Sequence, residues 1–275
     1  MTRHEYAHLD VFTDRAFGGN QLAVFHDGWG VTDAEMQAIA KELNLPETVF
    51  VAKPEKGGDH RLRIFTPARE LPFAGHPTVG AAYFLAEGKD ADLRLEEGVG
   101  TLTVTVRDGF VEMEQPIPTF EPVRDRAQIA AQLSLEVRDL VPTMPIEIGS
   151  SGNRFMFVPV NDIDAVRRAS PRGVGEAAYI FTTETVETGS TTHGRMYAGW
   201  QGIAEDPATG SAFGPLAAYL VRHGLSDGKR IVGEQGYEMG RPSILYARVA
   251  GTKDRITSVH VGGRCVRTGG GWVDL

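Results

Sequence analysis

The chain has 275 residues, of which 41% are hydrophobic and 23% are charged, and its formal net charge is −8. This composition is typical of a globular protein with one large or two smaller domains, and the negative charge disfavours binding to nucleic acid. The N-terminus lacks an apolar signal core and no apolar run is long enough for a bilayer, so we expect no membrane association and a cytoplasmic location. The single cysteine, Cys265, excludes an internal disulfide, a cysteine-rich zinc site and any mechanism with two thiols in one chain.

The first half of the chain is predicted to contain many strands and two helices. Strands are expected over residues 8–12, 22–25, 62–65, 93–95, 101–106 and 110–114. Thr32 with Glu35 three residues later predicts a capping box at the start of a helix that ends at residues 44–46. Glu47 therefore lies in a short joint between this helix and the next strand. A second helix, over residues 77–87, starts on proline and is apolar nearly all round, which predicts that it is buried.

The second half is predicted to follow the same plan. Prolines at positions 116 and 118 suggest a linker, so we expect an N-terminal half over residues 1–117, with or without the C-terminal strand, and a C-terminal half over residues 118–275. The expected helices cover residues 127–133, 163–169 and 211–223, and the strands cover 146–148, 155–160, 178–182, 194–197, 230–232, 243–249, 256–261 and 272–275. Many strands around one apolar helix differ from the βαβ alternation of a nucleotide-binding fold, and no glycine-rich phosphate-binding sequence occurs at a strand–helix junction.

One sequence box occurs twice in the chain. Each copy begins with an arginine in a strand-like run, continues through a glutamate and ends in a titratable residue before a proline and a small-residue helix. The members are Arg63, Glu70, His76 and Pro77 in the first copy and Arg195, Glu205, Asp206 and Pro207 in the second. His76 and Asp206 lie 206 − 76 = 130 positions apart, which is close to half of the 275 residues.

Other echoes keep the same order along the chain. Gly19 before Asn20 matches Gly152 (152 − 19 = 133), and Glu47 before an apolar run matches Glu176 (176 − 47 = 129). We interpret the chain as a duplicated fold with a cleft between its halves, and we expect the two boxes to face each other across it. The alternative is that turn and strand signals of this kind recur by chance in any α/β protein.

The helix after each box has free backbone N–H groups and a partial positive charge at its N-terminus, which bind carboxylate or phosphate groups. Gly75, Gly80 and Gly210 allow a ligand to approach the backbone closely. Two such helix ends facing one cleft would hold a small anionic substrate. The alternative is helix capping alone, since Asp206 and Ser211 are good cap residues.

Glu47, His76 and Asp206 are the titratable residues that we expect to converge. The apolar neighbours of Glu47 indicate partial burial, which would raise its pKa toward the working pH of an acid–base catalyst. The alternative is an ordinary glutamate at the start of a strand. His76 either bonds to a carbonyl group or forms an oriented pair with Asp206. The remaining histidines show no metal-ligand spacing, so no metal is expected.

Three segments resemble the PhzF family, the phenazine-biosynthesis isomerases and their relatives. They are residues 43–50 (LNLPETVF), 65–77 (FTPARELPFAGHP) and 205–212 (EDPATGSA), and the match extends through 113–118, 145–148 and 235–243 to nearly the whole chain. The resemblance implies a diaminopimelate epimerase-like α/β (α+β) fold. Its two pseudo-symmetric halves would each be a highly curved mixed sheet around a central apolar helix, with the active site in the cleft between them.

The resemblance also implies a function: isomerisation of trans-2,3-dihydro-3-hydroxyanthranilate without a cofactor. Glu47 matches the catalytic glutamate of the family and would move a proton from C3 to C1 of the ring. The other positions that match are His76, Asp206 and Ser211 as catalytic residues and Gly75, Gly210, Thr209 and Asn20 as substrate-binding residues. The family resemblance further suggests a homodimer.

Two departures from the family pattern put the exact substrate in doubt. Pro46 stands where the family often has serine beside the glutamate, and Ala198-Gly199, followed by Trp200, replaces a proline-containing turn. The alternatives are an isomerase acting on another secondary-metabolite carboxylate, an amino-acid epimerase or racemase, and a non-catalytic small-anion binder. The two-thiol mechanism usual for epimerases of this fold is not available to a chain with one cysteine.

Overall fold

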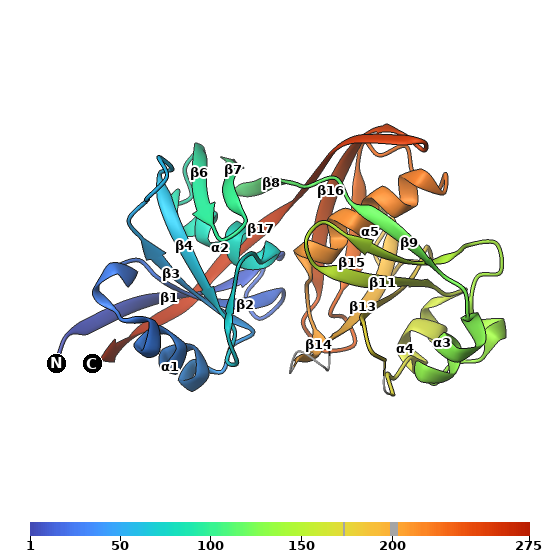
Figure 1. The fold of residues 1–275 in the computed structure, drawn as a ribbon, viewed down its shortest axis with the longest axis horizontal. Coiled ribbons are helices and arrows are strands. Elements are labelled where there is room, and N and C mark those ends of the chain that lie inside the picture. Colours follow the sequence, from blue (N-terminus) through green and yellow to red (C-terminus); the bar gives the residue numbers. More distant parts are fainter. Residues whose placement is uncertain (173, 199–202) are drawn as a thin grey trace. The chain divides into compact units, whose positions relative to one another are not determined.

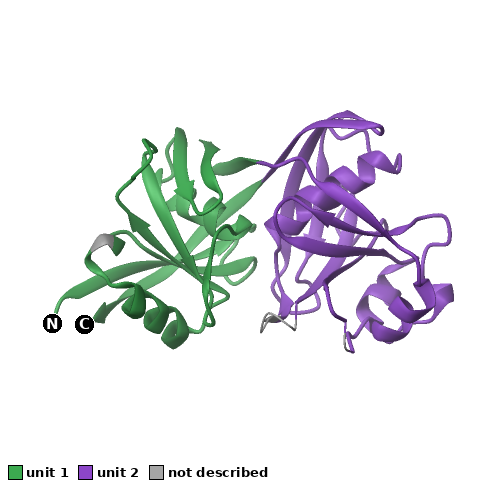
Figure 2. Ribbon diagram, in the orientation of Figure 1, with its two compact units in different colours: residues 1–114, 262–275 green, residues 115–261 purple. Residues whose placement is uncertain are grey.

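The computed structural model describes residues 1–172, 174–198 and 203–275, and the chain divides into two compact units (Figure 2). Unit 1 comprises residues 1–114 and 262–275, and unit 2 comprises residues 115–261. The change from one unit to the other at 114/115 lies three residues before the predicted boundary at 117/118, and the last part of the chain belongs to unit 1. Of the sequence departures noted above, Gly199 and Trp200 lie outside the described residues.

Unit 1 is a curved sheet wrapped around one helix (Figure 1). Its elements are β1 (Arg3–Val11), β2 (Asn20–Phe25), α1 (Asp33–Leu43), β3 (Glu47–Ala52), β4 (His60–Phe65), β5 (Glu70–Leu71), α2 (Gly75–Leu85), β6 (Ala91–Glu97), β7 (Gly100–Arg107), β8 (Phe110–Gln115) and the C-terminal part of β17 (Arg255–Asp274). The sheet closes into a barrel because β17 pairs with both β1 and β8. The two termini lie side by side, where the Thr2 amide donates to the Leu275 carbonyl at 2.7 Å.

The helices of unit 1 follow from local sequence. Thr32 and Glu35 form the predicted capping box, and Asn44 ends α1 in the left-handed conformation that asparagine tolerates. Helix α2 contacts β1, β2, β3 and β7 and is buried along its first two turns, as its apolar sequence predicts. It begins at Gly75, two residues before the predicted start at Pro77.

Unit 2 has the same kind of architecture around a second helix. Its elements are β9 (Thr119–Val123), α3 (Arg126–Gln132), β10 (Ile146–Ser150), β11 (Arg154–Pro159), α4 (Ile163–Arg168), β12 (Ala177–Thr182), β13 (Thr192–Ala198), β14 (Ile203–Asp206), α5 (Gly210–Arg222), β15 (Ile231–Gln235), β16 (Ser243–Thr252) and the N-terminal part of β17. Helix α5 is the buried one and contacts β10, β11 and β16. Single-turn 3-10 helices lie at Gly28–Gly30 in unit 1 and at Val137–Asp139 in unit 2.

The strand pairing of unit 1 is repeated in unit 2, which confirms the two pseudo-symmetric halves. Strands β1 to β4 pair antiparallel, parallel and antiparallel in succession, and so do β10 to β13. Strand β4 then pairs antiparallel with β5 and parallel with β6, as β13 does with β14 and β15. Helix α2 lies between β5 and β6 in the chain, and α5 lies between β14 and β15.

The strand register corrects two of the sequence echoes. Phe50 pairs with Arg63 and Ile180 pairs with Arg195, so Phe50 and Ile180 correspond with an offset of 180 − 50 = 130. The same offset places Ala177, and not Glu176, at the position of Glu47. A one-residue slip moves a side chain to the other face of a sheet, which is why the echo between the two glutamates was misleading.

The second correction concerns the boxes. The first helical residues, Gly75 and Gly210, correspond with an offset of 210 − 75 = 135, so the residue of unit 2 that corresponds to His76 is Ser211 and not Asp206. The prediction matched the two residues before proline, His76 and Asp206, but Asp206 belongs to the end of β14. The boxes are therefore repeated, but not in the register that the prolines indicate.

Further differences remain between the predicted and observed strands. The strands expected over 256–261 and 272–275 are one strand, β17, whose glycines weaken the strand pattern in the sequence. The short strands β5, β9 and β14 were not predicted.

No helix among the described residues is long and apolar enough to cross a membrane.

Candidate active site

Asn20, Glu47 and His76 come together in unit 1 because three elements begin at the same edge. Asn20 is the first residue of β2, Glu47 is the first residue of β3, and His76 is the second residue of α2. Strands β2 and β3 run parallel with Leu22 opposite Glu47, so their N-terminal ends lie at the same edge of the sheet. Of the predicted site residues of this half, Gly75 is the first residue of α2 and lies next to His76.

The contacts of His76 define its state. Its Nδ1 atom accepts a hydrogen bond from the Asn20 amide at 3.2 Å, which leaves the ring proton on Nε2. Nε2 lies 3.3 Å from the Gln21 carbonyl oxygen and 3.4 Å from Oε2 of Glu47. Burial lowers the pKa of His76 to about 3, against the smaller opposite effect of the Gln21 carbonyl. His76 is therefore a neutral imidazole that points its one N–H toward a carbonyl and a carboxylate.

Of the two alternatives for His76, the structure contains the carbonyl contact, and a pair with Asp206 of the other unit stays a prediction. The carboxylate beside the ring within unit 1 belongs to Glu47. The Glu47 side chain is only 10% exposed. The neutral ring can donate one hydrogen bond to it but brings no positive charge. A buried carboxylate with an oriented neutral donor is an arrangement suited to taking up and returning a proton.

Asp206, Thr209, Gly210 and Ser211 surround the start of α5 in unit 2. Asp206 ends β14, Thr209 precedes the helix, and Gly210 and Ser211 are its first two residues. The Thr209 hydroxyl donates to Oδ2 of Asp206 at 2.6 Å. Thr209 thus orients the Asp206 carboxylate, a role that the sequence analysis did not assign to it.

Gln235 holds this segment together and was not among the predicted site residues. Its Nε2 atom donates to the Asp206 carbonyl at 2.7 Å and to the Thr209 hydroxyl at 2.9 Å, and its Oε1 atom accepts from the Thr209 amide at 3.1 Å. The side chain is fully buried at the end of β15. A sequence signal existed, since Glu234-Gln235 in the second half echoes Glu96-Glu97 in the first.

The arginine and glutamate of each box join the two strands that precede the buried helix. Arg63 of β4 pairs with Glu70 of β5, and Arg195 of β13 pairs with Glu205 of β14 through two hydrogen bonds of 2.8 Å. Arg63 also donates to Asp33 at the start of α1 at 2.8 Å. These repeated residues hold strands in place and belong to the scaffold.

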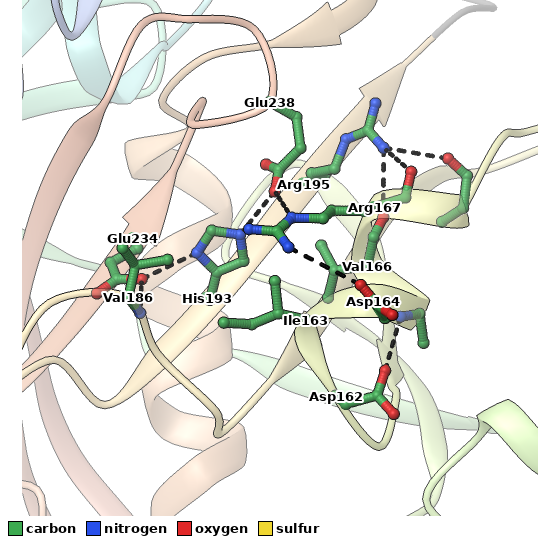
Figure 3. Close-up of polar contacts among 12 residues, drawn as sticks. Asp162, Ile163, Asp164, Val166, Arg167, Val186, His193, Arg195, Glu234 and Glu238 are labelled. Atoms are coloured by element: carbon green, nitrogen blue, oxygen red, sulfur yellow. Dashed lines mark hydrogen bonds and ion pairs between the residues drawn. The ribbon is translucent and has the colours of Figure 1, made fainter.

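A buried polar cluster in unit 2 centres on His193 (Figure 3). Its two ring nitrogens each lie 2.9 Å from a carboxylate oxygen, Nδ1 from Glu234 and Nε2 from Glu238. Burial opposes protonation of the ring, but the hydrogen bonds and charges of the two carboxylates outweigh it and raise the pKa of His193 to about 9. Glu234 also accepts the amides of Val186 and Glu187, so the cluster fixes a loop. Within the described ranges, no group of three or more His, Cys, Asp or Glu side chains is arranged to hold a metal ion.

Comparison with known proteins places this chain among phenazine-related enzymes. The sequence model described as "Phenazine biosynthesis-like protein" (PhzC-PhzF) matches residues 9–271. A protein of Pseudomonas fluorescens named trans-2,3-dihydro-3-hydroxyanthranilate isomerase is 39% identical over 281 residues, which cover 99% of this chain and 100% of that protein.

Solved structures show the same relationship. A Bacillus anthracis phenazine biosynthesis protein of the PhzF family superposes with a TM-score of 0.92 and 29% identity, and the match covers 100% of both chains. A hydroxyproline epimerase from Agrobacterium vitis superposes with a TM-score of 0.65 and 11% identity, over 99% of this chain and 91% of that one. The latter similarity shows a shared fold alone.

Proposed function

Since the chain belongs to the PhzF family and is an isomerase of the PhzF type, we propose that its substrate is trans-2,3-dihydro-3-hydroxyanthranilate and that Glu47 moves one proton on it without a cofactor. The substrate assignment is supported by the 39% identity to the Pseudomonas fluorescens isomerase over the full length of both proteins. The assignment of the base is supported by the position of Glu47, whose carboxylate lies 3.4 Å from the N–H nitrogen of a neutral, oriented His76.

In the proposed reaction, Glu47 removes the proton from C3 of the ring. The electrons of that bond form a C3–C4 double bond, and the C4–C5 and C6–C1 double bonds are replaced by a C5–C6 double bond and a new bond from C1 to hydrogen. Glu47, protonated in the first step, supplies that hydrogen. The enol at C3 then tautomerises to a ketone, so no atom is gained or lost and no oxidant is needed.

The asymmetry between the halves supports a mechanism with one base. Ala177 occupies the position in unit 2 that Glu47 occupies in unit 1, and the partly exposed Glu176 lies 3.5 Å from Arg154. We propose that Asp206, Ser211 and the helix ends at Gly75 and Gly210 bind the polar groups of the substrate, with Asn20 and Thr209 orienting their neighbours. A small anionic substrate held between the halves, a homodimer and a cytoplasmic location stay predictions.

The test is turnover of trans-2,3-dihydro-3-hydroxyanthranilate, followed by absorbance and by NMR in deuterated water. Glu47→Gln is expected to lower kcat by about 10²- to 10⁴-fold, the usual contribution of a positioned acid–base group. The matched control is Glu176→Gln. It removes the carboxylate that precedes Ala177, the residue of unit 2 that corresponds to Glu47, and we expect the variant to keep turnover. If Glu47 returns the proton that it removed, part of the product formed in deuterated water carries protium at C1.

Two results would contradict the proposal separately. No turnover by the wild-type protein would remove this substrate. Turnover by Glu47→Gln at the wild-type rate would remove Glu47 as the base, whatever the substrate.

A further inference from the structure

Glu97 is a buried carboxyl group directly beneath the N-terminus of α2. It is the last residue of β6 and is only 5% exposed. The Thr78 hydroxyl oxygen lies 2.6 Å from Oε1 of Glu97 and 2.7 Å from the Ala74 carbonyl oxygen. A hydroxyl has one hydrogen, and the carbonyl can only accept. When Thr78 donates to Ala74, the short contact with Glu97 therefore requires a hydrogen on the carboxyl group.

The duplicated half contains a neutral residue at the same place. Strand β6 pairs with β4 at Arg61 and Glu96, and β15 pairs with β13 at His193 and Glu234. Arg61 and His193 differ by 193 − 61 = 132, the offset of Arg63 and Arg195 in the same strands. The next residue along, Glu97, therefore corresponds to Gln235.

The two side chains also make the same contact. Gln235 accepts the amide of Thr209, the residue that precedes α5, and Glu97 accepts the amide of Ala74, the residue that precedes α2. An amide performs this task in unit 2 with an N–H₂ group to donate and an oxygen to accept. A protonated carboxyl group has the same pair of functions, whereas a carboxylate can only accept.

The charged groups around Glu97 do not offset a buried negative charge. Those that line the cavity beside it are Glu55, Lys56, Arg61, Arg63, Glu70 and Glu96. The arginines are bound to Glu55 and Glu70, and Glu96 accepts three backbone amides of the 55–58 loop. On the helix side, His76 is neutral. Burial raises the pKa of Glu97 to about 8, and the opposing hydrogen bonds from Thr78 and Ala74 are the smaller effects.

We propose that Glu97 is a protonated carboxylic acid in the working enzyme and that it positions the first turn of α2, which carries Gly75 and His76, for the isomerase reaction. The effect on the reaction rests on the proposed function, whereas the protonated state of Glu97 does not. A neutral group beneath the helix leaves the partial positive charge of the helix end available to an anionic substrate. Loss of the proton makes Thr78 donate to the carboxylate in place of the Ala74 carbonyl, and it places a negative charge behind that helix end.

The expected kinetic signature is in substrate binding. As the pH rises through about 8, KM of the wild-type enzyme rises about tenfold, the effect of losing a helix-end interaction with an anion. Glu97→Gln keeps one hydrogen-bond donor and one acceptor without a charge, so it is expected to abolish this rise of KM. Glu97→Leu loses both hydrogen bonds and lowers activity at every pH. A rise of KM that persists unchanged in Glu97→Gln would overturn the positioning role.

A spectroscopic experiment tests the protonated state without substrate. Infrared difference spectra near neutral pH should show a protonated carboxyl C=O band that disappears in Glu97→Gln and fades in the wild type as the pH rises through about 8. The matched control is Glu96→Gln, which removes the neighbouring carboxylate with a lowered pKa and should leave the band in place. Absence of the band in the wild type would overturn the inference, even if the enzyme turns over its proposed substrate. A band without turnover would contradict the proposed function alone.

Discussion

His193 gives the fold a dependence of stability on pH that can be measured. Its imidazole is fully buried between Glu234 and Glu238, and its pKa is raised from 6.5 to about 9. A basic group with a higher pKa in the folded than in the unfolded state stabilises the fold while it is protonated. The stabilisation is therefore complete below about pH 6.5 and is lost as the pH rises through about 9.

The magnitude follows from the size of the shift. Raising the pKa from 6.5 to about 9 corresponds to about 3 kcal/mol of unfolding free energy, at about 1.4 kcal/mol for each pH unit. Removing the ring leaves the carboxylates of Glu234 and Glu238 buried without the imidazolium between them, and breaking a buried pair in this way costs about 3–5 kcal/mol. His193→Gln is thus expected to be less stable than the wild type by about 3 kcal/mol near neutral pH and nearly as stable at about pH 10.

Urea unfolding across this pH range measures the difference between the two proteins, so other titrating groups cancel. Because two compact units need not unfold together, hydrogen exchange of the Val186 and Glu187 amides, which donate to Glu234, provides a local measurement. The control is His26→Gln, which changes an exposed histidine and should not alter the profile. A stability difference between wild type and His193→Gln that stays constant from neutral pH to pH 10 would refute a buried imidazolium.

Two further substitutions test the support of the Asp206 segment. Gln235→Leu removes all three hydrogen bonds and leaves the Thr209 amide and the Asp206 carbonyl buried without this partner, which should cost about 2–4 kcal/mol in urea unfolding; a loss below about 0.5 kcal/mol would mean that the segment is held otherwise. Gly236→Ala places a methyl group 2.4 and 2.6 Å from two backbone oxygen atoms, whereas Gly240→Ala, at a similar positive φ, meets nothing within 4 Å. The first should therefore be less stable than the second by about 1–3 kcal/mol, and equal stability would show that backbone conformation alone makes glycine necessary at position 236.

The features that could be read from the sequence are those that depend on neighbouring residues. The capping box at Thr32 and Glu35 is a local hydrogen-bond pattern, and the end of α1 at Asn44 fixes Glu47 at the start of the next strand. Burial of α2 and α5 follows from their apolar sequences. The family resemblance then selected Glu47 from among many glutamates, which no local pattern does.

The features that were missed depend on strand register. The contact of His76 with Glu47 needs the parallel pairing of β2 and β3. The sequence analysis did not single out Glu97, whose burial depends on the packing of α2 against the end of β6. The predicted match of Glu47 with Glu176 failed by one position, because an amino-acid echo does not record which face of the sheet a side chain occupies. The His76–Asp206 match failed because proline follows both residues, although only His76 lies inside a helix.

Once the register is known, comparing corresponding positions in the two halves distinguishes residues needed for folding from residues needed for function. Positions that keep both residue type and contacts in the two halves, such as the arginine braces at Arg63 and Arg195, are explained by folding alone. Positions that differ are where the halves have diverged in function: Glu47 corresponds to Ala177. Glu97 and Gln235 form a third class, because they keep the contact but differ in whether they can ionise. Either a protonated glutamate or a glutamine can support the start of a helix. Only Glu97 can ionise, and it lies in unit 1, the half that also holds the proposed base Glu47. A change of its protonation with pH therefore acts on that half.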